Sequence, residues 1–408
     1  MAKEYDVMVA GHVCFDLIPK FLDDTSKQLH EILIPGTLVT VGDCKMSTGG
    51  PVSNTGIGIQ ILGHTVCFCA RVGDDFLGNM IQEILLKHGN TEAIKKVSGQ
   101  SSSYTIAISP PNIDRVFLHN PGTNHEFSAD DLDSRLIAQS RHFHFGYPPV
   151  MRRMYQNEGI ELKRVFQIAK EAGAITSCDM CLPDPKSGAT WSKILEHILP
   201  YIDLHLPSLE ETFYMLEPET YLENKNEVRG DDLIYHSDIG DYSRLADKLL
   251  AMGTKMVALK AGEKGFYFKT SDAELIKTIG EEESLDSDNW ANRELFCPAF
   301  VAPQVASATG SGDSSIAGFL AAFIRKLPIE TCLKYACLVG WQNVQVLDAI
   351  SGIKNWEETK RIYEQGVAIH DVKWKSKEWY WNEQYKLWAG PNDPLNESGK
   401  GARKINNQ

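Results

Sequence analysis

The segment from Ala306 to Phe319 contains the residue types best suited to chemistry. Two glycines, Gly310 and Gly312, precede Asp313 and the apolar run of a predicted helix. Glycines let backbone N–H groups approach an anion, and the start of a helix adds partial positive charge there. An aspartate at that position can accept a proton from an attacking hydroxyl while the amides hold charge building on a transferred phosphoryl group. The alternative is a simple helix N-cap, worth about 1 kcal/mol.

Two further segments are rich in glycine. The diglycine Gly49-Gly50 stands at the start of a predicted helix that contains Asn54. This arrangement suits a loop that hydrogen-bonds a polyhydroxylated ligand, although ordinary turn and cap signals have the same composition. The third segment, Lys260 to Gly265, is a glycine turn after a predicted strand and is a weak signal alone.

The elements that must position these residues alternate between strand and helix along most of the chain. Apolar residues recur at helical spacing from Asp75 to Lys87, for example, whereas Met256 to Lys260 is a short apolar run typical of a buried strand. This alternation predicts an α/β fold with a mostly parallel sheet covered by helices on both faces. Such sheets bind ligands where the carboxyl ends of strands meet helix N-termini.

Two kinds of segment break the alternation. Residues 104–119 and Leu38 to Val41 have the pattern of antiparallel strands, so we expect a small sheet, built from segments near 12–48 and 100–122, that acts as a lid. Residues 217–240 and 280–295 are acidic, contain Gly or Asn and are aperiodic, which predicts surface insertions.

The C-terminal part is unusually rich in tryptophan. Four of the eight tryptophans fall between positions 374 and 388 (Trp374, Trp379, Trp381 and Trp388). We expect a main domain over 1–370 and an extension over 371–408, which either docks its aromatics on the body or serves as a partner-binding arm. Residues from Leu395 onward are predicted to be disordered.

Composition excludes several classes of protein. The 408 residues carry 41 Lys+Arg against 54 Asp+Glu, a net charge of −13, which argues against a nucleic-acid binder. No apolar run approaches the roughly 18–20 residues of a membrane span. The nine cysteines and the lack of a visible export signal favour reduced thiols and a cytoplasmic location.

Taken together, the motifs resemble those of the ribokinase-like (PfkB) family of carbohydrate kinases over residues 5–355. The first family signature is similar to Gly49–Gly78, and the second, ordinarily D-T-x-G-A-G-D, is similar to Ser307–Asp313. Three smaller matches are the G-x-x-G turn of Gly262 and Gly265, the early aspartate Asp16, and Pro121–Asn124, which resembles P-G-A-N.

The resemblance implies a three-layer α/β/α fold with a β lid and a role for each matching residue. Asp313 would be the general base, and the amides of Gly310, Ser311 and Gly312 would form an anion hole. Other implied contacts are to the sugar (Asp16, Gly49, Gly50, Asn54), to ATP (Ser208, Lys260, Gly262, Gly265, Asn343) and to Mg²⁺ (Glu211, at the family's N-x-x-E motif). Arg115, on the lid segment, is a further candidate for contacting a substrate phosphate or carboxylate.

Three residues depart from the family pattern. Ser208 stands where N-x-x-E has Asn, Ser307 where the second signature opens with Asp, and Ser311 where it has Ala. Serine can hydrogen-bond but supplies no carboxylate charge. Asp179 resembles the aspartate of a D-P-N stretch in fructokinase-type members, but Met180 and Cys181 follow it.

We therefore expect an ATP- and Mg²⁺-dependent kinase acting on a hydroxyl of a sugar or sugar-like small molecule. A nucleoside kinase of the same fold, and a catalytically weak ligand-binding or regulatory homologue, are the alternatives. Dependence on a monovalent cation and formation of a homodimer are both left open by the sequence.

Overall fold

Two β-sheets organise the part of the chain that the computed structural model describes, which is residues 3–22, 28–110, 116–227, 232–280 and 285–396. Among these residues, eleven strands form one sheet and four strands form another. In spatial order the larger sheet contains β14 (Tyr380–Asn382), β15 (Leu387–Ala389), β13 (Glu294–Pro298), β12 (Gly265–Thr270), β11 (Met256–Lys260), β10 (Leu204–His205), β9 (Ile175–Asp179), β8 (Ser140–Gly146), β1 (Tyr5–Gly11), β4 (Val66–Gly73) and β5 (Ile94–Val97).

The seven strands from β11 to β5 all run parallel to one another. This confirms the mostly parallel sheet expected from the alternation of strands and helices. The other strands of the sheet, β12, β13, β15 and β14, pair antiparallel at one edge. That antiparallel edge was not expected from the sequence.

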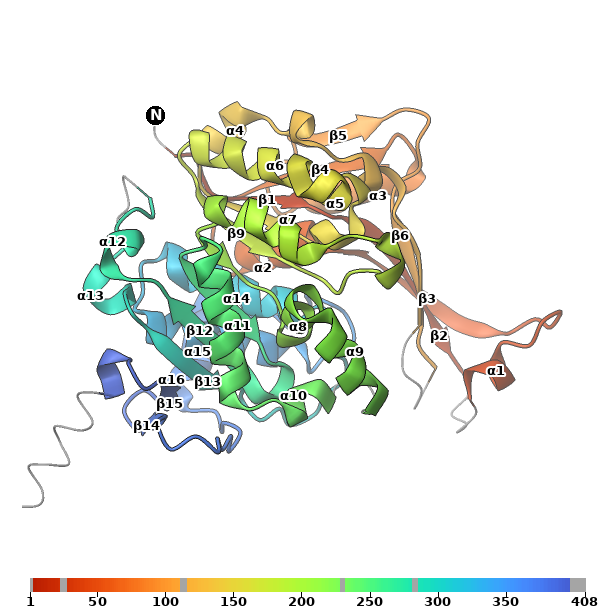
Figure 1. The fold of residues 1–408 in the computed structure, drawn as a ribbon. Helices are drawn as coiled ribbons and strands as arrows, with labels where there is room; N and C mark the ends of the chain where they lie inside the picture. Colours follow the sequence, from red (N-terminus) through yellow and green to blue (C-terminus); the bar gives the residue numbers. More distant parts are fainter. Residues whose placement is uncertain (1–2, 23–27, 111–115, 228–231, 281–284, 397–408) are drawn as a thin grey trace, which may run out of the picture.

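Helices cover both faces of the large sheet and complete the three layers (Figure 1). One face packs against α2 (Pro51–Ile61), α3 (Phe76–Leu86), α14 (Ser311–Ile324) and α15 (Ile329–Asn343). The opposite face packs against α4 (Ser134–Ala138), α6 (Ile160–Glu171), α7 (Trp191–Ile198), α8 (Leu209–Leu216) and α11 (Ile239–Ala251). Further helices are α5 (Arg152–Tyr155), α12 (Ala273–Ile276) and α16 (Trp356–Gln365).

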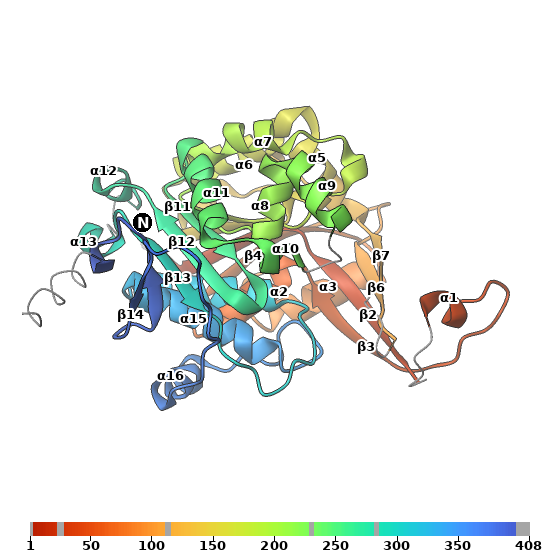
Figure 2. The same cartoon turned by 60° about the horizontal axis from the view of Figure 1, so that its bottom comes forward.

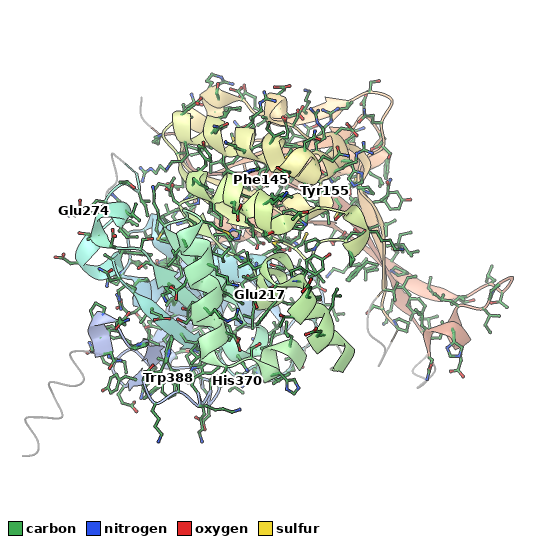
Figure 3. The ribbon with its side chains drawn as sticks, viewed as in Figure 1. Phe145, Tyr155, Glu217, Glu274, His370 and Trp388 are labelled. Carbon is green, nitrogen blue, oxygen red and sulfur yellow. The ribbon has the colours of Figure 1, made fainter. Side chains whose placement is uncertain are left out.

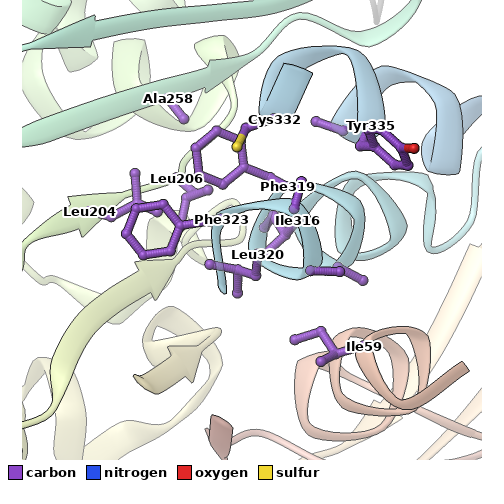
Figure 4. Packing of buried hydrophobic residues seen from close by; sticks show 14 of the residues in the cluster. Ile59, Leu204, Leu206, Ala258, Ile316, Phe319, Leu320, Phe323, Cys332 and Tyr335 are labelled. Atoms are coloured by element: carbon purple, nitrogen blue, oxygen red, sulfur yellow. The ribbon is translucent and has the colours of Figure 1, made fainter. Parts of the chain in front are cut away.

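Aromatic packing fixes α14 against the sheet. Figure 4 shows Phe319 and Phe323 of α14 beside Leu204 and Leu206, with Ile59 of α2 on the other side of the helix. The ring of Phe319 lies 5.2 Å from that of Phe268 on β12, measured between centroids. Because this apolar body of the helix is buried on all sides, its first turn is held at the carboxyl edge of the parallel strands.

The second sheet projects from the body as the expected lid. It contains β3 (Val41–Gly49), β2 (Cys14–Phe21), β6 (Tyr104–Ile108) and β7 (Val116–Asn120), and the short helix α1 (Leu29–Ile32) lies at its far end (Figure 2). The prediction of a strand over Leu38 to Val41 was wrong, because the strand begins at Val41 and continues to Gly49. Its pairing with β2 along that length decides the boundary.

The segment after α16 docks on the body. Strand β15 pairs with β13, and the Trp374 ring packs edge-on against Phe296 with centroids 4.8 Å apart. Figure 3 shows Trp388 on this side of the molecule, away from the lid. The structure thus gives the aromatics the docked arrangement. Leu395 and Asn396 belong to it, since the Asn396 amide donates to Gly390 O at 2.9 Å; residues 397–408, also predicted to be disordered, lie outside the described part.

The segments 217–240 and 280–295, expected as surface insertions, contain regular elements where the structure describes them. The first region contains α9 (Pro218–Glu227) and α10 (Asp232–His236), and the second contains α13 (Ser287–Trp290) and the start of β13. Tyr221 and Trp290 are buried and anchor these helices. In these segments a single buried aromatic stands among many charged residues, so the sequence shows no apolar periodicity from which the helices could be predicted.

A buried ion-pair cluster ties the C-terminal segment to the sheet. Arg293 donates to Asp393 at 3.0 Å and to Glu330 at 2.6 Å, and all three side chains are at most 5% exposed. Removing one partner of a buried pair leaves an uncompensated charge.

We therefore expect Asp393→Ala to lower the free energy of unfolding by about 3 kcal/mol, measured by urea denaturation. Asp371→Ala is the control in the same segment, since Asp371 and its partner Lys373 are both 80% exposed. Its effect should stay below about 0.5 kcal/mol. Equal effects of the two substitutions would contradict the role assigned to the buried cluster.

Candidate active site

Polar side chains converge where the carboxyl ends of the central strands meet the first turns of α2 and α14. His12 follows β1, Tyr147 follows β8, and Asp179 and Lys260 are the last residues of β9 and β11. This is the edge of the sheet at which the alternating pattern predicts a ligand site.

Asp313 lies in the first turn of α14 and is 2% exposed. The Asn54 amide donates to its carboxylate at 2.9 Å, and the Thr55 hydroxyl does so at 3.4 Å. Burial raises the pKa of the Asp313 carboxyl, while the Asn54 hydrogen bond and the charge of Lys260 oppose that rise. Gly310, not Asp313, occupies the N-cap position, so the simple capping interpretation does not describe this carboxylate.

The backbone of residues 310–312, which we call the cradle, makes a tight turn just before Asp313. Gly310 has φ of 72°, and a Cβ there would lie 2.5 Å from the Ala349 side chain, so only glycine fits. The Ser311 amide donates to Ala308 O at 3.2 Å. Among the described residues, the amides of Gly310 and Gly312 have no hydrogen-bond partner. Two of the three expected amides are therefore open to a ligand, and that of Ser311 closes the turn.

Lys260 lies beneath this cradle. A Cβ on Gly312 would be 3.7 Å from its Cδ, and its ammonium donates to Asp179 and, at 2.7 Å, to Leu206 O. Burial opposes the charged form of Lys260, but Asp179 and Glu211 outweigh it and raise the pKa of the ammonium. Burial raises the pKa of Asp179, and the positive charge of Lys260 opposes that rise. The site thus holds a buried cation next to the glycine turn that precedes Asp313.

Asp16 approaches from the lid strand β2. The Cys14 thiol donates to its carboxylate at 3.2 Å, and a Cβ on Gly49 would lie 2.2 Å from that carboxylate, so a side chain at position 49 would displace it. Burial raises the pKa of Asp16 to about 6. The charge of Asp313 raises the pKa of Asp16 further, as expected of two carboxylates that share a site.

Comparison with known proteins agrees with this geometry. The family described as pfkB family carbohydrate kinase matches residues 6–356. The chain belongs to the pfkB family of carbohydrate kinases.

One curated relative of this pfkB chain is fructokinase-1 of Zea mays, 29% identical over 134 residues, which are 32% of this chain and 41% of that protein. The chain thus aligns with only about two fifths of that relative. The fold matches a ribokinase of Arabidopsis thaliana solved with ribose and ATP (TM-score 0.63, 19% identity, 89% of this chain and 99% of that one). It also matches an Escherichia coli protein described as a ribokinase II candidate, solved with ATP and Mg²⁺ (TM-score 0.63, 16% identity, 90% and 100%).

The residues that depart from the pfkB pattern have local structural roles. Ser208 is the N-cap of α8: its hydroxyl accepts from the Glu211 amide at 3.1 Å, and its own amide donates to Glu211 Oε2 at 2.6 Å. This capping box holds Glu211 at the edge of the site. Ser307 similarly accepts from the Thr309 amide at 3.0 Å, which shapes the approach to the cradle.

The expected ATP-side residues lie in two places. Gly262 and Gly265 form the turn between β11 and β12, both with positive φ. Asn343 is fully buried and its amide donates to Thr309 O at 3.1 Å, so it supports the loop from below. Arg115, expected at the acceptor, lies outside the described residues.

Sequence reasoning missed several members of the site. Tyr147 has φ of 60°, the left-handed region that is rare outside glycine, and its hydroxyl contributes a hydrogen bond to Asp313. Burial and the charges of Asp313 and Asp179 raise the pKa of Tyr147, so the phenol stays protonated and donates. No motif marked it; its place after a buried strand was the available signal. Thr55 follows Asn54 in the first family signature, and this position was the signal that could have identified it as a site residue.

The site costs stability at neutral pH. A carboxyl with a raised pKa binds its proton more tightly in the folded state, so its contribution to stability falls as pH rises from about 4 through 6. We expect Asp16→Asn to raise the free energy of unfolding at pH 7.5 by about 1–2 kcal/mol, allowing for partial exposure, and to change it little at pH 4.

Denaturation curves at both pH values measure this difference. Asp43→Asn, on an exposed position of lid strand β3, is the matched control. A pH-independent effect of Asp16→Asn would contradict the prediction.

Proposed function

We propose that this pfkB family member is an ATP- and Mg²⁺-dependent kinase that phosphorylates a hydroxyl of a sugar or sugar-like small molecule. The observation that carries the proposal is the Asp313 carboxylate, buried against Asn54 and placed beside two open amides at the start of α14. A base and an anion cradle side by side are what transfer of a phosphoryl group to an alcohol needs.

The acceptor would lie between the body and the lid. Asp16 and Asn54 would hold its hydroxyls, and Gly49 and Gly50 would let it approach the backbone. The Asn54 Oδ1 and Asn124 Oδ1 atoms are buried with no partner among the described residues, and such oxygens suit hydroxyl donors. Asp313 would take the proton of the attacking hydroxyl, with Tyr147 and Thr55 keeping its carboxylate oriented.

The phosphate side would use the amides of Gly310 and Gly312 and the ammonium of Lys260. Gly262 and Gly265 would border the nucleotide. Asp179 Oδ2 is a buried oxygen with no partner in the described part of the chain, and with Glu211 it offers the hard oxygen ligands that Mg²⁺ prefers. Mg²⁺ bound there would neutralise charge on the phosphates of ATP. The E. coli structure solved with ATP and Mg²⁺ supports both cofactors.

The lid would close over the acceptor and exclude water, which limits transfer of the phosphoryl group to water. We also propose the cytoplasm as the compartment, because all nine cysteines are free thiols. None of the helices described is long and apolar enough to cross a bilayer.

The test is ADP release with Mg-ATP over a panel of pentoses, hexoses, keto-acids and nucleosides. We expect at least one sugar to stimulate release, and EDTA to abolish it. Running the panel in potassium and in tetramethylammonium salts tests monovalent-cation dependence. Stimulation by nucleosides alone would replace the proposal with a nucleoside kinase, and ATP binding without any acceptor would replace it with a regulatory homologue.

The outer face of the lid suggests a homodimer. Its central row, Met46–Leu17–Ile106–Leu118, is apolar, with Met46 61% and Leu118 52% exposed. Contiguous exposed apolar surface marks an interface, and a second copy of the chain presents the same apolar row.

Light scattering should give twice the monomer mass for the wild type, and Leu118→Lys should reduce the measured mass to that of the monomer. Leu86→Lys, at an exposed leucine of α3, is the control, and a wild-type monomer would refute the dimer.

A further inference from the structure

The face of the lid that carries Asp16 has an unbroken polar row. Across β3, β2, β6 and β7, the paired residues are Ser47, Asp16, Thr105 and His119. Residues paired across strands share one face of a sheet. His119 therefore lies on the same face as the acceptor-side carboxylate, at the other end of the row.

His12 faces this row from the body. It is 4% exposed, and neither of its ring nitrogens has a partner in the part of the chain that the structure describes. A buried polar group without a hydrogen bond costs free energy, so an unpartnered imidazole in a site indicates a ligand that completes it. A Cβ on Gly50 would lie 2.6 Å from His12 Nδ1, which places this imidazole beside the diglycine.

The two imidazoles meet across the junction of body and lid. Their ring centroids are 5.3 Å apart. Burial, followed by the charges of His119 and His125, lowers the pKa of His12 to about 3, and burial and His125 lower the pKa of His119. Both rings are therefore neutral at pH 7, and each has one donor nitrogen and one acceptor nitrogen.

A chain of hydrogen bonds sets the tautomer of His119. The Thr105 hydroxyl has one proton, and its two other partners, Cys14 Sγ at 3.6 Å and the Asp16 carboxylate, both accept from it. His119 Nδ1 lies 3.0 Å from the same hydroxyl and must then donate to its oxygen. This leaves His119 Nε2 as an acceptor, while His12 is free to supply the donor.

We propose that His12 and His119 together bind one hydroxyl of the polyhydroxylated acceptor and so determine which acceptor is used. His12 donates to that hydroxyl oxygen, and His119 Nε2 accepts its proton. This is a different hydroxyl from the one that is phosphorylated, since Asp313 is hydrogen-bonded to Asn54, Thr55 and Tyr147 and to neither of the two histidines among the described residues. The inference rests on the proposed kinase function and adds specificity residues to it.

The experiment uses the full chain and the sugar that the wild type turns over best. For His12→Asn and His119→Ala we expect the KM for that sugar to rise about tenfold each, with kcat and the KM for ATP within about twofold, because the lost contact is remote from the transferred group. The double variant should raise the KM for the sugar little more than either single variant does, since both rings bind the same hydroxyl.

Deoxy analogues of the sugar identify the hydroxyl. One analogue should show a raised KM with wild type and no further rise with His119→Ala. His197→Asn, at an exposed histidine of α7, is the control and should change nothing. His119 lies on an exposed lid position, so its variant keeps the test valid if His12→Asn does not fold.

Unchanged sugar KM in His119→Ala, or a loss of kcat equal to the loss of kcat/KM, would overturn the inference while leaving the kinase proposal intact. Absence of sugar turnover by the wild type would overturn both. The two failures are therefore distinguishable.

Discussion

The burial of one carboxylate at the start of a helix is the constraint on which the rest of the structure depends. Burial disfavours the charged form of Asp313, because the carboxylate loses its contact with water. Hydrogen bonds from α2 and the charge of Lys260 from β11 offset this loss. Those contacts bring the first turn of α14 together with α2, about 260 positions earlier in the sequence, and with the end of β11, about 50 positions earlier. The apolar packing of Phe319 and Phe323 holds the helix so that these contacts can form.

The same site has more negative than positive charge among its described side chains. Asp179, Glu211 and Asp313 lie around Lys260, Asp16 interacts with Asp313, and burial raises the pKa of each of the four carboxyls. Burying several like charges together destabilises the free protein, whereas bound cations and hydroxyl donors would neutralise or hydrogen-bond these carboxylates and stabilise the arrangement. Such stored cost is common where a site is built for a ligand rather than for stability.

Local patterns predicted the parts of the molecule that depend on local rules. The helix over 75–87, the parallel strands and the glycine turns follow from periodicity and backbone conformation, and the spacing of motifs indicated the site residues near Asp313 and Asp16. The antiparallel edge formed by β13 and β15 joins residues almost 100 positions apart, which no local signal reports. Tyr147 was missed for the same reason, because its left-handed backbone depends on the strands around it.

The role of Ser208 also required the structure. From the sequence it was a departure at a metal-binding motif, whereas in the fold it caps α8 and holds Glu211 in place. A substitution in a motif can thus preserve geometry while changing the chemical group that maintains it. The helices α9 and α10 give the opposite lesson, since a charged, aperiodic composition concealed their buried anchors.

The most direct test of the account is single-turnover phosphoryl transfer by Asp313→Asn. With the acceptor identified for the wild type, we predict a fall of at least about 100-fold in the transfer rate and little change in ATP affinity, because the base is lost while the amide cradle remains. Asp272→Asn, which alters a carboxylate that caps the short helix α12, controls for a purely structural effect. Transfer by Asp313→Asn at near the wild-type rate would contradict the central claim.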